Sequence, residues 1–341
     1  MDHAKRKQDH LYICLSADVR SCLSTGLEAI RLRHNALPDL NLRDVSTATD
    51  FLGHSLAMPL LLSSMTGGTP EGGRINRRLA QAAQATGVAL ALGSGRIALL
   101  EPDTLPTFRV RDVAPDILLL ANLGAVQLNQ GLTAQDCRRL VELVEADGLI
   151  LHLNALQEAL QPGGDTAFRG LLDRIAEVCA VVPFPVIVKE VGWGLSGPVA
   201  AALASAGVTA LDVAGAGGTS WSEVERLRAT DPFIAEVAAP FRSWGLTTVE
   251  SLRAVVEACP TLPVIASGGL RTGVDLAKCL ALGASLGGVA AGLLPAAAES
   301  AEAVERALAV IQAQLTAAMF ATGAATVSAL DAQTILRGGD A

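Results

Sequence analysis

The sequence predicts one α/β domain folded as a (β/α)8 barrel, or TIM barrel, with an N-terminal extension and a C-terminal helix. The chain has 341 residues, a length that suits a single large domain of this kind. Half of the residues are hydrophobic but only 3% are aromatic, and 33 are glycine. This composition is typical of helices packed on a parallel sheet through tight loops. Short apolar runs also alternate eight times with longer amphipathic stretches.

The candidate strands are short runs of aliphatic and β-branched residues, each followed by glycine or polar residues. Runs of this kind are typical of strands that are buried on both faces of a parallel sheet. In chain order they cover residues 59–63, 88–92, 117–121, 149–153, 186–189, 210–213, 264–266 and 286–290.

The candidate helices lie between these strands. Several of them end at a glycine, as at Gly87, Gly207 and Gly283, which predicts a left-handed C-terminal cap. The helices cover residues 75–86, 134–146, 168–181, 198–206, 248–258 and 273–282, and one long helix covers 299–322.

We expect a single domain over residues 1–341, with the extension in 1–57, the barrel in 58–298 and the C-terminal helix and tail in 299–341. A doubly wound open sheet is the structural alternative. Such a sheet usually carries a GxGxxG turn after its first strand, whereas this chain has Met65-Thr66-Gly67-Gly68 there.

Charge and cysteine usage narrow the possible partners and the compartment. The net charge of −8 argues against a nucleic-acid partner. The six cysteines show no CxxC spacing, so we interpret them as scattered thiols and not as disulfides or zinc ligands. The charged start MDHAKRKQDH is unlike a secretory signal, and the uncharged stretch 279–298 contains four glycines and a proline. We therefore expect a cytoplasmic protein without a membrane partner.

Polar residues and glycines recur after the candidate strands, where the active sites of such barrels lie. Gly268-Gly269 with Arg271, followed by Ala290-Ala291, has the form of a phosphate site after strands seven and eight. The alternative is two ordinary glycine turns. Because barrels often bind phosphate after these two strands, we favour the phosphate site.

Two other strands end in charged or polar side chains. Lys189 would point into the barrel mouth, where it could stabilise negative charge on a flavin, or form a salt bridge with Glu190 or another neighbour. His152 and Asn154 lie on one face of the fourth strand, and Gln157 and Glu158 follow within one helical turn, which predicts a shared polar site. The cationic start at residues 5–7 is interpreted from composition alone as a solvated tail.

Taken together in order and spacing, these segments resemble the type 2 isopentenyl-diphosphate isomerases over nearly the full chain. The segments that carry the resemblance are Arg6-Lys7 with His10-Leu11, Ala36-Leu37-Pro38, Met65-Thr66-Gly67-Gly68, Ala121-Asn122-Leu123-Gly124, His152-Leu153-Asn154, Leu156-Gln157-Glu158, Gln161-Pro162-x-Gly164-Asp165, Val188-Lys189-Glu190-Val191-Gly192, Gly217-Gly218-Thr219, Trp244-Gly245 and Ser267-Gly268-Gly269-Leu270-Arg271.

The resemblance implies an enzyme of isoprenoid biosynthesis that interconverts isopentenyl and dimethylallyl diphosphate with reduced FMN, Mg²⁺ and NADPH as the reductant. It also implies a homo-oligomer, either a tetramer or an octamer. Glu158 would hold Mg²⁺ against the diphosphate, and Gln157, His152 and Asn154 are the candidate catalytic residues. The substrate would contact Arg6, Lys7, Arg96, His152, Asn154 and Gln157. FMN would be held by Ser64, Met65, Thr66, Ser94, Asn122, Lys189, Thr219, Gly268, Gly269, Arg271, Ala290 and Ala291.

The chain departs from the family pattern at two places, of which the second is expected to be neutral. The family commonly has glutamine where this chain has Gly95, and Ile-Pro-Thr where it has Leu246-Thr247-Thr248. The first departure motivates a non-catalytic flavin-binding barrel as an alternative. The other alternative is an FMN-dependent 2-hydroxy-acid oxidase, whose chemistry needs a histidine base beside the flavin. No histidine follows His152 in the sequence, which disfavours the oxidase.

Overall fold

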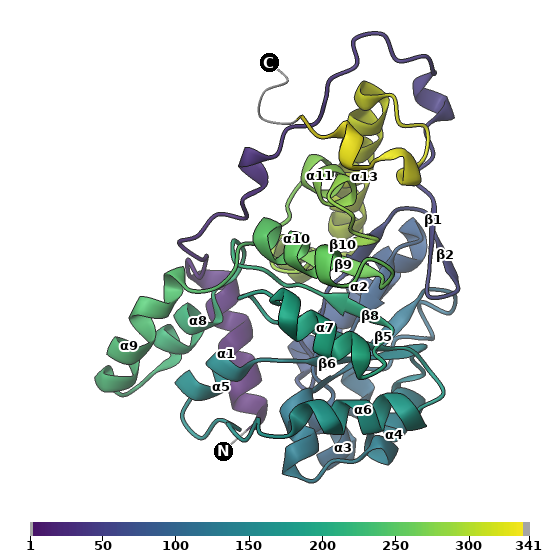
Figure 1. Ribbon diagram of the computed structural model, residues 1–341. Helices are drawn as coiled ribbons and strands as arrows, with labels where there is room; N and C mark the ends of the chain where they lie inside the picture. The colour runs from purple at the N-terminus through teal and green to yellow at the C-terminus, as the bar shows by residue number, and fades with distance from the viewer. Residues whose placement is uncertain (1–2, 337–341) are drawn as a thin grey trace.

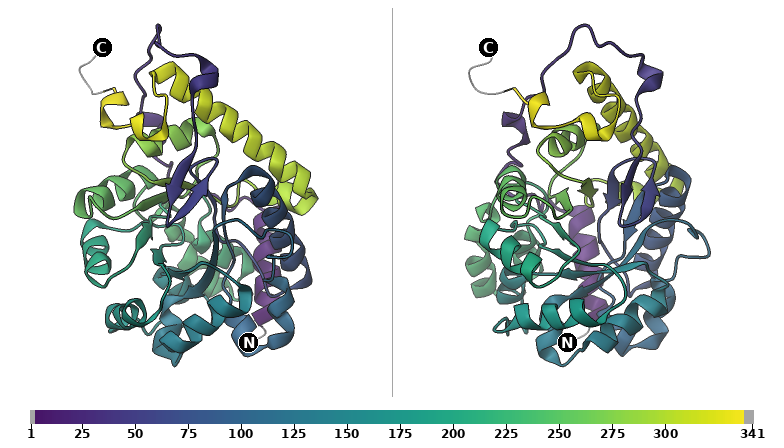
Figure 2. Two further views of the ribbon diagram at one scale, coloured as in Figure 1. Left: turned by 90° about the vertical axis from the view of Figure 1, so that its right-hand side faces the viewer. Right: turned by 45° about the vertical axis from the view of Figure 1, so that its right-hand side comes forward.

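A computed structural model describes residues 3–336 of the chain. Eight parallel strands form a closed barrel in the order β3 to β10, and β10 pairs with β3 to complete the ring (Figure 1). Helices surround the barrel on its outside (Figure 2). The prediction of a (β/α)8 barrel is therefore confirmed, and the open sheet is excluded.

The strands lie close to the predicted runs, with one difference that matters for the site. β5 ends three residues later than predicted because it pairs with β6 up to Gly124 and His152, so Asn122 lies inside a strand. The strands are β1 Thr49–Phe51, β2 His54–Leu56, β3 Leu60–Leu62, β4 Ala89–Ala91, β5 Leu119–Gly124, β6 Gly148–His152, β7 Val186–Lys189, β8 Ala210–Asp212, β9 Val264–Ser267 and β10 Leu286–Val289.

Local sequence accounts for where many helices begin and end. α4, α10 and α11 are each preceded by an N-cap threonine whose side chain forms a capping box with an acidic residue three positions later. The helices are α1 His3–Ser16, α2 Pro70–Thr86, α3 Arg96–Leu100, α4 Ala134–Val144, α5 Ala155–Leu160, α6 Leu171–Val181, α7 Gly197–Ser205, α8 Trp221–Arg228, α9 Pro232–Ala238, α10 Thr248–Ala258, α11 Gly273–Ala281, α12 Leu294–Glu299 and α13 Ala301–Thr322.

The predicted long helix over 299–322 is confirmed as α13, but it begins at Ala301, two residues later than predicted. α12 ends at Glu299 and α13 begins at Ala301, with Ser300 between them in an extended conformation (φ −163°, ψ 170°). The Ser300 hydroxyl accepts a hydrogen bond from the Ala303 backbone N–H at 3.1 Å. Serine favours the N-cap position, which is why a new helix starts here.

The apolar residues form an inner and an outer layer around the strands. Side chains alternate along each strand, so Leu61 points into the barrel while Leu60 and Leu62 pack against the helices. The hairpin β1–β2 closes the amino-terminal end of the barrel, where Phe51 and Leu56 pack on the interior residues. The interior cluster comprises Phe51, Leu56, Leu61, Ala89, Ala91, Leu118, Leu120, Ile150, Ile187, Ala210, Ile265 and Leu286.

The opposite, carboxyl-terminal end of the barrel is partly covered by α1 (Figures 1 and 2). This helix contacts α8 and carries Arg6 and Lys7 into the interior of the fold. The interpretation of the cationic start as a solvated tail is therefore wrong for these two residues. Within residues 3–336, no helix combines the length and the apolar character needed to cross a membrane.

Candidate functional site

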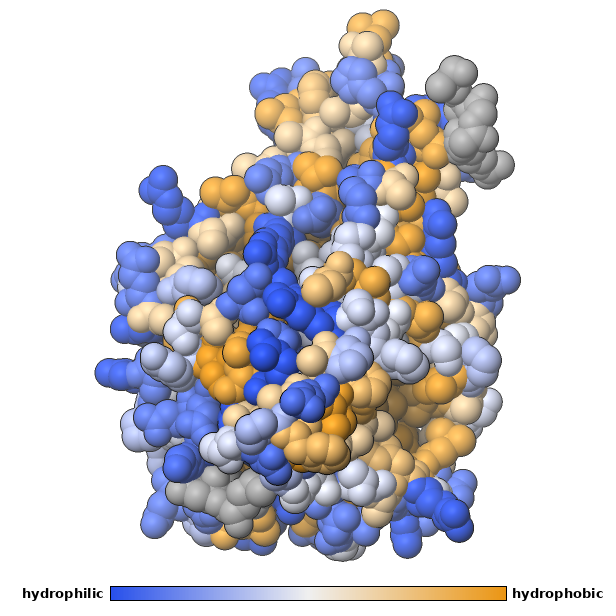
Figure 3. Space-filling model, turned by 90° about the vertical axis from the view of Figure 1, so that its left-hand side faces the viewer, coloured by the Kyte–Doolittle hydropathy of each residue, from blue (hydrophilic) through white to orange (hydrophobic). Residues whose placement is uncertain are grey.

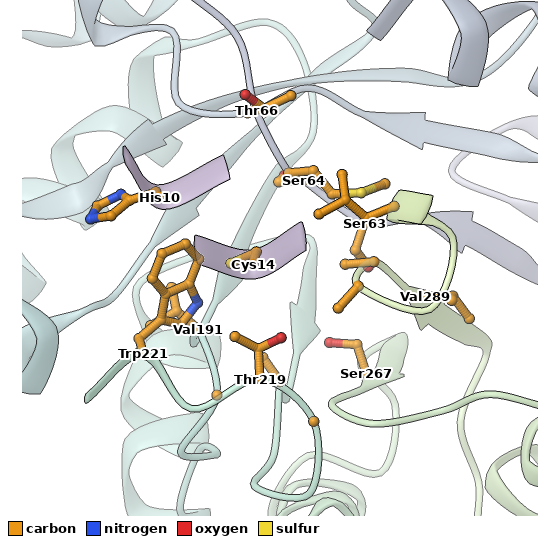
Figure 4. Close-up of a pocket in the computed structure, with 18 of the residues that line it drawn as sticks. His10, Cys14, Ser63, Ser64, Thr66, Val191, Thr219, Trp221, Ser267 and Val289 are labelled. Carbon is orange, nitrogen blue, oxygen red and sulfur yellow. The ribbon is translucent and has the colours of Figure 1, made fainter. Parts of the chain in front are cut away.

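A large cavity of about 1170 Å³ opens at the carboxyl ends of the strands, between them and α1 (Figure 4). Pockets of roughly 300–1,000 Å³ hold cofactors and small substrates, so this cavity has room for both together. Every residue predicted for the cofactor, the substrate or the metal lies in its lining. Their individual roles stay predictions.

The loops after β8 and β9 lie in direct backbone contact at one end of the cavity. A Cβ atom on Gly268 would lie 2.1 Å from the Gly215 carbonyl oxygen, and one on Gly269 would lie 2.5 Å from that of Gly217. Both glycines of the predicted phosphate turn also have positive φ angles, of 104° and 83°. Only glycine fits at these two positions. The exposed Arg271 lines the cavity beside the two glycines. This end of the cavity therefore fits a phosphate group.

Lys189 is 8% exposed and lies at the floor of the cavity. Its Nζ atom donates a hydrogen bond to the Glu190 backbone carbonyl at 2.5 Å. The Glu190 carboxylate turns instead to its own loop, where it accepts from the N–H groups of Val191, Gly192 and Trp193 at 2.6–2.7 Å. Burial outweighs these contacts and raises the pKa of Glu190 to about 7. The predicted salt bridge between Lys189 and Glu190 is therefore wrong, whereas a pairing of Lys189 with another neighbour stays a prediction.

A hydrogen-bonded chain links the carboxyl ends of three strands through Ser64, Asn122 and His152. The Asn122 amide nitrogen donates to Ser64 Oγ at 2.9 Å, and its oxygen lies 2.7 Å from His152 Nδ1. Because an amide oxygen can only accept, Nδ1 carries the proton and Nε2 is left as an acceptor. Burial, together with the charges of Lys189 and Lys7, lowers the pKa of His152 to about 3. The imidazole is therefore neutral at physiological pH.

Both oxygen atoms of the buried Glu158 carboxylate accept hydrogen bonds. Its Oε1 atom accepts from the Asn154 amide at 2.8 Å, and its Oε2 atom accepts from the Asp165 backbone N–H at 2.7 Å and from the Gln161 amide. Within the described residues, no three acidic, histidine or cysteine side chains gather as a metal site. The Asn154 Oδ1 atom is buried and, among those same residues, has no hydrogen-bond partner. One carboxylate and one free amide oxygen fit Mg²⁺, which takes most ligands from water and phosphate.

Three cations line the part of the cavity near Glu158. Lys7 Nζ donates to the Ser94 carbonyl at 2.7 Å, and burial, helped by the Arg6 charge, lowers the pKa of Lys7 to about 7. Arg96 pairs with Asp165 at 2.7 Å. Cations crowded together in a buried site favour an anionic ligand, because such a ligand relieves both their burial and their mutual repulsion.

Sequence reasoning missed Glu225, which belongs to α8 and is 1% exposed. Its Oε1 atom accepts from the Gln157 amide at 3.1 Å and lies 2.9 Å from His10 Nε2. Burial acts to raise the pKa of Glu225, but the contact with His10 and the charge of Arg228 outweigh it and lower the pKa to about 2. In the sequence, Glu225 is one of several charged residues in an ordinary helix, so only the contact between α1 and α8 identifies it.

The departure at Gly95 has a structural reason. A Cβ atom on this residue would lie 2.6 Å from Leu140 Cδ1 and 3.1 Å from Leu140 Cδ2. Leu140 belongs to α4 and is 1% exposed. Its side chain therefore occupies the space that a side chain at position 95 would enter.

Comparisons of the sequence identify close relatives. The profile described as FMN-dependent dehydrogenase matches residues 153–337. A protein of Synechococcus sp. named isopentenyl-diphosphate delta-isomerase is 54% identical over 334 residues, which cover 98% of this chain and 96% of the relative. A protein of Rickettsia africae with the same name is 50% identical over 326 residues, covering 96% of this chain and 95% of the relative.

Comparisons of the structure find barrels with low sequence identity. A mandelate oxidase that carries an FMN adduct superimposes with a TM-score of 0.66 at 18% identity, covering 98% of each chain. A flavocytochrome b2 variant with pyruvate bound gives a TM-score of 0.70 at 17% identity, covering 96% of this chain and 82% of the other. At this level of identity, the similarity shows a shared fold and nothing more.

Proposed function

Because this chain belongs to the isopentenyl-diphosphate delta-isomerases, within the FMN-dependent dehydrogenase family, we propose that it interconverts isopentenyl and dimethylallyl diphosphate. One structural observation supports the proposal in addition to family membership. A single cavity joins a glycine-built phosphate turn and the cation Lys189 to a second group of cations beside the carboxylate Glu158. Such a cavity suits a flavin phosphate at one end and a diphosphate at the other.

The cofactor would lie along the ends of β3, β4, β5, β7, β8, β9 and β10. Lys189 would face negative charge on the reduced ring, and the turn at Gly268 and Gly269 would receive the phosphate. Reduced FMN supplies an electron-rich ring that stabilises positive charge on the substrate, together with a nitrogen that exchanges protons. NADPH would be the reductant. The remaining FMN contacts proposed are Ser64, Met65, Thr66, Ser94, Asn122, Thr219, Arg271, Ala290 and Ala291.

The diphosphate would be held by Arg6, Lys7 and Arg96, with Mg²⁺ between it and Glu158. Binding at several points fixes the direction of the hydrocarbon part of the substrate. That fixed orientation lowers the entropy cost of the reaction.

The reaction adds a proton at the terminal carbon and removes one from the carbon nearer the diphosphate. Gln157, His152 and Asn154 line the cavity and would position these carbon atoms. His152 is neutral and holds its proton at Nδ1 against Asn122, so its Nε2 atom offers an acceptor. The Gln157 amide is fixed by the anionic Glu225, which leaves its oxygen in a defined direction.

The 2-hydroxy-acid oxidase and the non-catalytic barrel are disfavoured as alternatives. The oxidase reaction needs a histidine base beside the flavin, and this chain has no histidine after His152. The non-catalytic barrel was motivated by Gly95, and the packing of Leu140 gives this glycine a steric reason that requires no loss of catalysis. Neither alternative explains a group of cations beside a buried carboxylate.

Anaerobic product analysis tests the proposal. Protein loaded with FMN and supplied with NADPH, Mg²⁺ and isopentenyl diphosphate should form dimethylallyl diphosphate. Glu158→Gln and Lys189→Ala should each lower turnover by at least tenfold, whereas Glu177→Gln on the outer helix α6, an exposed carboxylate, should not. Near-normal turnover in both site variants would remove these role assignments.

Assembly into a tetramer or octamer and a cytoplasmic location stay predictions. The face that carries α8 and α9 mixes hydrophilic and hydrophobic patches (Figure 3). Phe233 and Trp244, on α9 and just after it in the chain, are 67% and 59% exposed. Exposed aromatic side chains are typical of protein interfaces. Light scattering of the purified protein measures the number of copies, and a monomer would contradict the expected assembly.

A further inference from the structure

Asp212 carries a buried carboxylate that the proposed function leaves without a role. It lies at the end of β8 and is 0% exposed. Its Oδ1 atom accepts from Ser267 Oγ at 2.5 Å and from the Ala214 backbone N–H at 3.3 Å. Its Oδ2 atom is buried and has no hydrogen-bond partner among residues 3–336. A carboxylate in such surroundings is costly unless a nearby charge compensates it.

The nearest strand supplies that compensating charge. Lys189 on β7 is the direct register partner of Asp212 on β8. Burial raises the pKa of Asp212, and the positive charge of Lys189 acts in the opposite direction. The other adjacent carboxylate, that of Glu190, is engaged by backbone N–H groups of its own loop. Asp212 is therefore the carboxylate that the fold places opposite Lys189.

Asp212 lies behind residues that line the cavity. It does not line the cavity itself, whereas Lys189 and Ser267 do. Ser63 and Ser267 lie on the same side of the pocket (Figure 4). Between them, a Cβ atom on Gly288 would lie 2.6 Å from Ser63 Oγ and 2.7 Å from Ser267 Cβ. Glycine at this position therefore lets the two serines pack closely beside Asp212.

We propose that Asp212 is a positioning residue that acts as the counter-ion of Lys189 and thereby lowers the reduction potential of the bound flavin. This inference rests on the FMN binding proposed above. With oxidised FMN, whose ring is neutral, the two buried charges balance each other. With reduced, anionic FMN, the same lysine faces two anions, so the carboxylate makes reduction less favourable.

The flavin midpoint potential tests this directly in FMN-loaded protein. Asp212→Asn keeps the shape of the side chain and removes its charge, so the potential should shift in the positive direction. Reduced FMN should correspondingly bind more tightly relative to oxidised FMN, by at least tenfold in the ratio of dissociation constants. The matched control is Asp173→Asn, which removes the same charge from the exposed start of α6 and should leave the potential unchanged.

A pair of variants covers the case in which Asp212→Asn alone fails to fold. Lys189→Met should shift the potential in the negative direction because it removes the cation that faces the reduced ring and leaves the buried carboxylate uncompensated. Lys189→Met combined with Asp212→Asn removes both charges, and its potential should lie above that of Lys189→Met alone.

If FMN-loaded wild-type protein and FMN-loaded Asp212→Asn had equal midpoint potentials, this inference would be overturned and the proposed function would not. A wild-type protein that takes up no FMN would overturn the proposed function, and this inference with it. The two failures are distinguished by the flavin absorbance of the wild-type protein.

Discussion

Replacing Gly95 by alanine tests whether Leu140 fills the space that a side chain at position 95 needs. The new Cβ atom would lie 2.6 Å from Leu140 Cδ1. Carbon atoms in contact prefer a separation of about 3.5–4.0 Å, so the leucine would have to move by about 1 Å. Leu140 is 1% exposed and packs in the core, where little free volume allows that movement.

The expected magnitude follows from two opposing effects. Overpacking a filled core typically costs about 1–3 kcal/mol. The backbone of Gly95, at φ −86° and ψ 6°, is open to alanine. Alanine therefore recovers about 0.4–1 kcal/mol by restricting the unfolded chain. The balance predicts that Gly95→Ala lowers the free energy of unfolding by about 1 kcal/mol.

A Leu140→Ala background should reverse the sign. Leu140→Ala alone opens a cavity and should cost about 2–5 kcal/mol. With the methyl groups of Leu140 gone, Gly95→Ala should raise the free energy of unfolding by about 0.5–1 kcal/mol.

The assay is urea unfolding of the four proteins of this double-mutant cycle, at one fixed FMN concentration. Two sites that do not interact give additive effects within about 0.5 kcal/mol. An effect of Gly95→Ala that is the same in both backgrounds within that margin would refute the steric reasoning.

Three further predictions concern the substrate end and one helix. The pKa of Lys7 near 7 predicts that the KM for isopentenyl diphosphate rises as pH increases from 7 to 9, because the lysine loses the charge that binds the diphosphate. Lys7→Arg should flatten this rise. An equal rise of KM in both proteins would contradict the role of Lys7. Glu158→Gln should raise the Mg²⁺ concentration for half-maximal turnover at least tenfold, and an unchanged Mg²⁺ titration would show that the metal lies elsewhere. Ser300→Ala should lower the free energy of unfolding by about 1 kcal/mol by removing the cap of α13. The control is Ser205→Ala, which removes an exposed hydroxyl bonded within α7 and should change the free energy of unfolding by less than about 0.5 kcal/mol.

Much of the barrel could be predicted because periodicity and turn chemistry are local properties of a sequence. Gly87, for example, has a φ of 67° and ends α2 as the glycine pattern predicts. The gathering of His152, Lys189 and Gly268 in one cavity also follows, since the carboxyl ends of all strands in such a barrel share one end.

What could not be predicted depends on contacts between distant segments. The packing of α1 on α8, which places His10 against Glu225, joins residues more than 200 positions apart. The pairing of Gly95 with Leu140 is likewise invisible along the chain, because a glycine shows nothing of what lies beside it. The break at Ser300 is a closer case, since serine caps helices yet also occurs within them, and periodicity alone did not separate the two.

The measurement that tests the central claim most directly is turnover in one anaerobic sample before and after reduction. The FMN-loaded protein is mixed with Mg²⁺ and isopentenyl diphosphate, product is measured, and the flavin is then reduced. We predict no dimethylallyl diphosphate while the flavin is oxidised, and steady formation of it after reduction, with no net reoxidation of the flavin. A protein that binds FMN but forms no product after reduction would contradict the account.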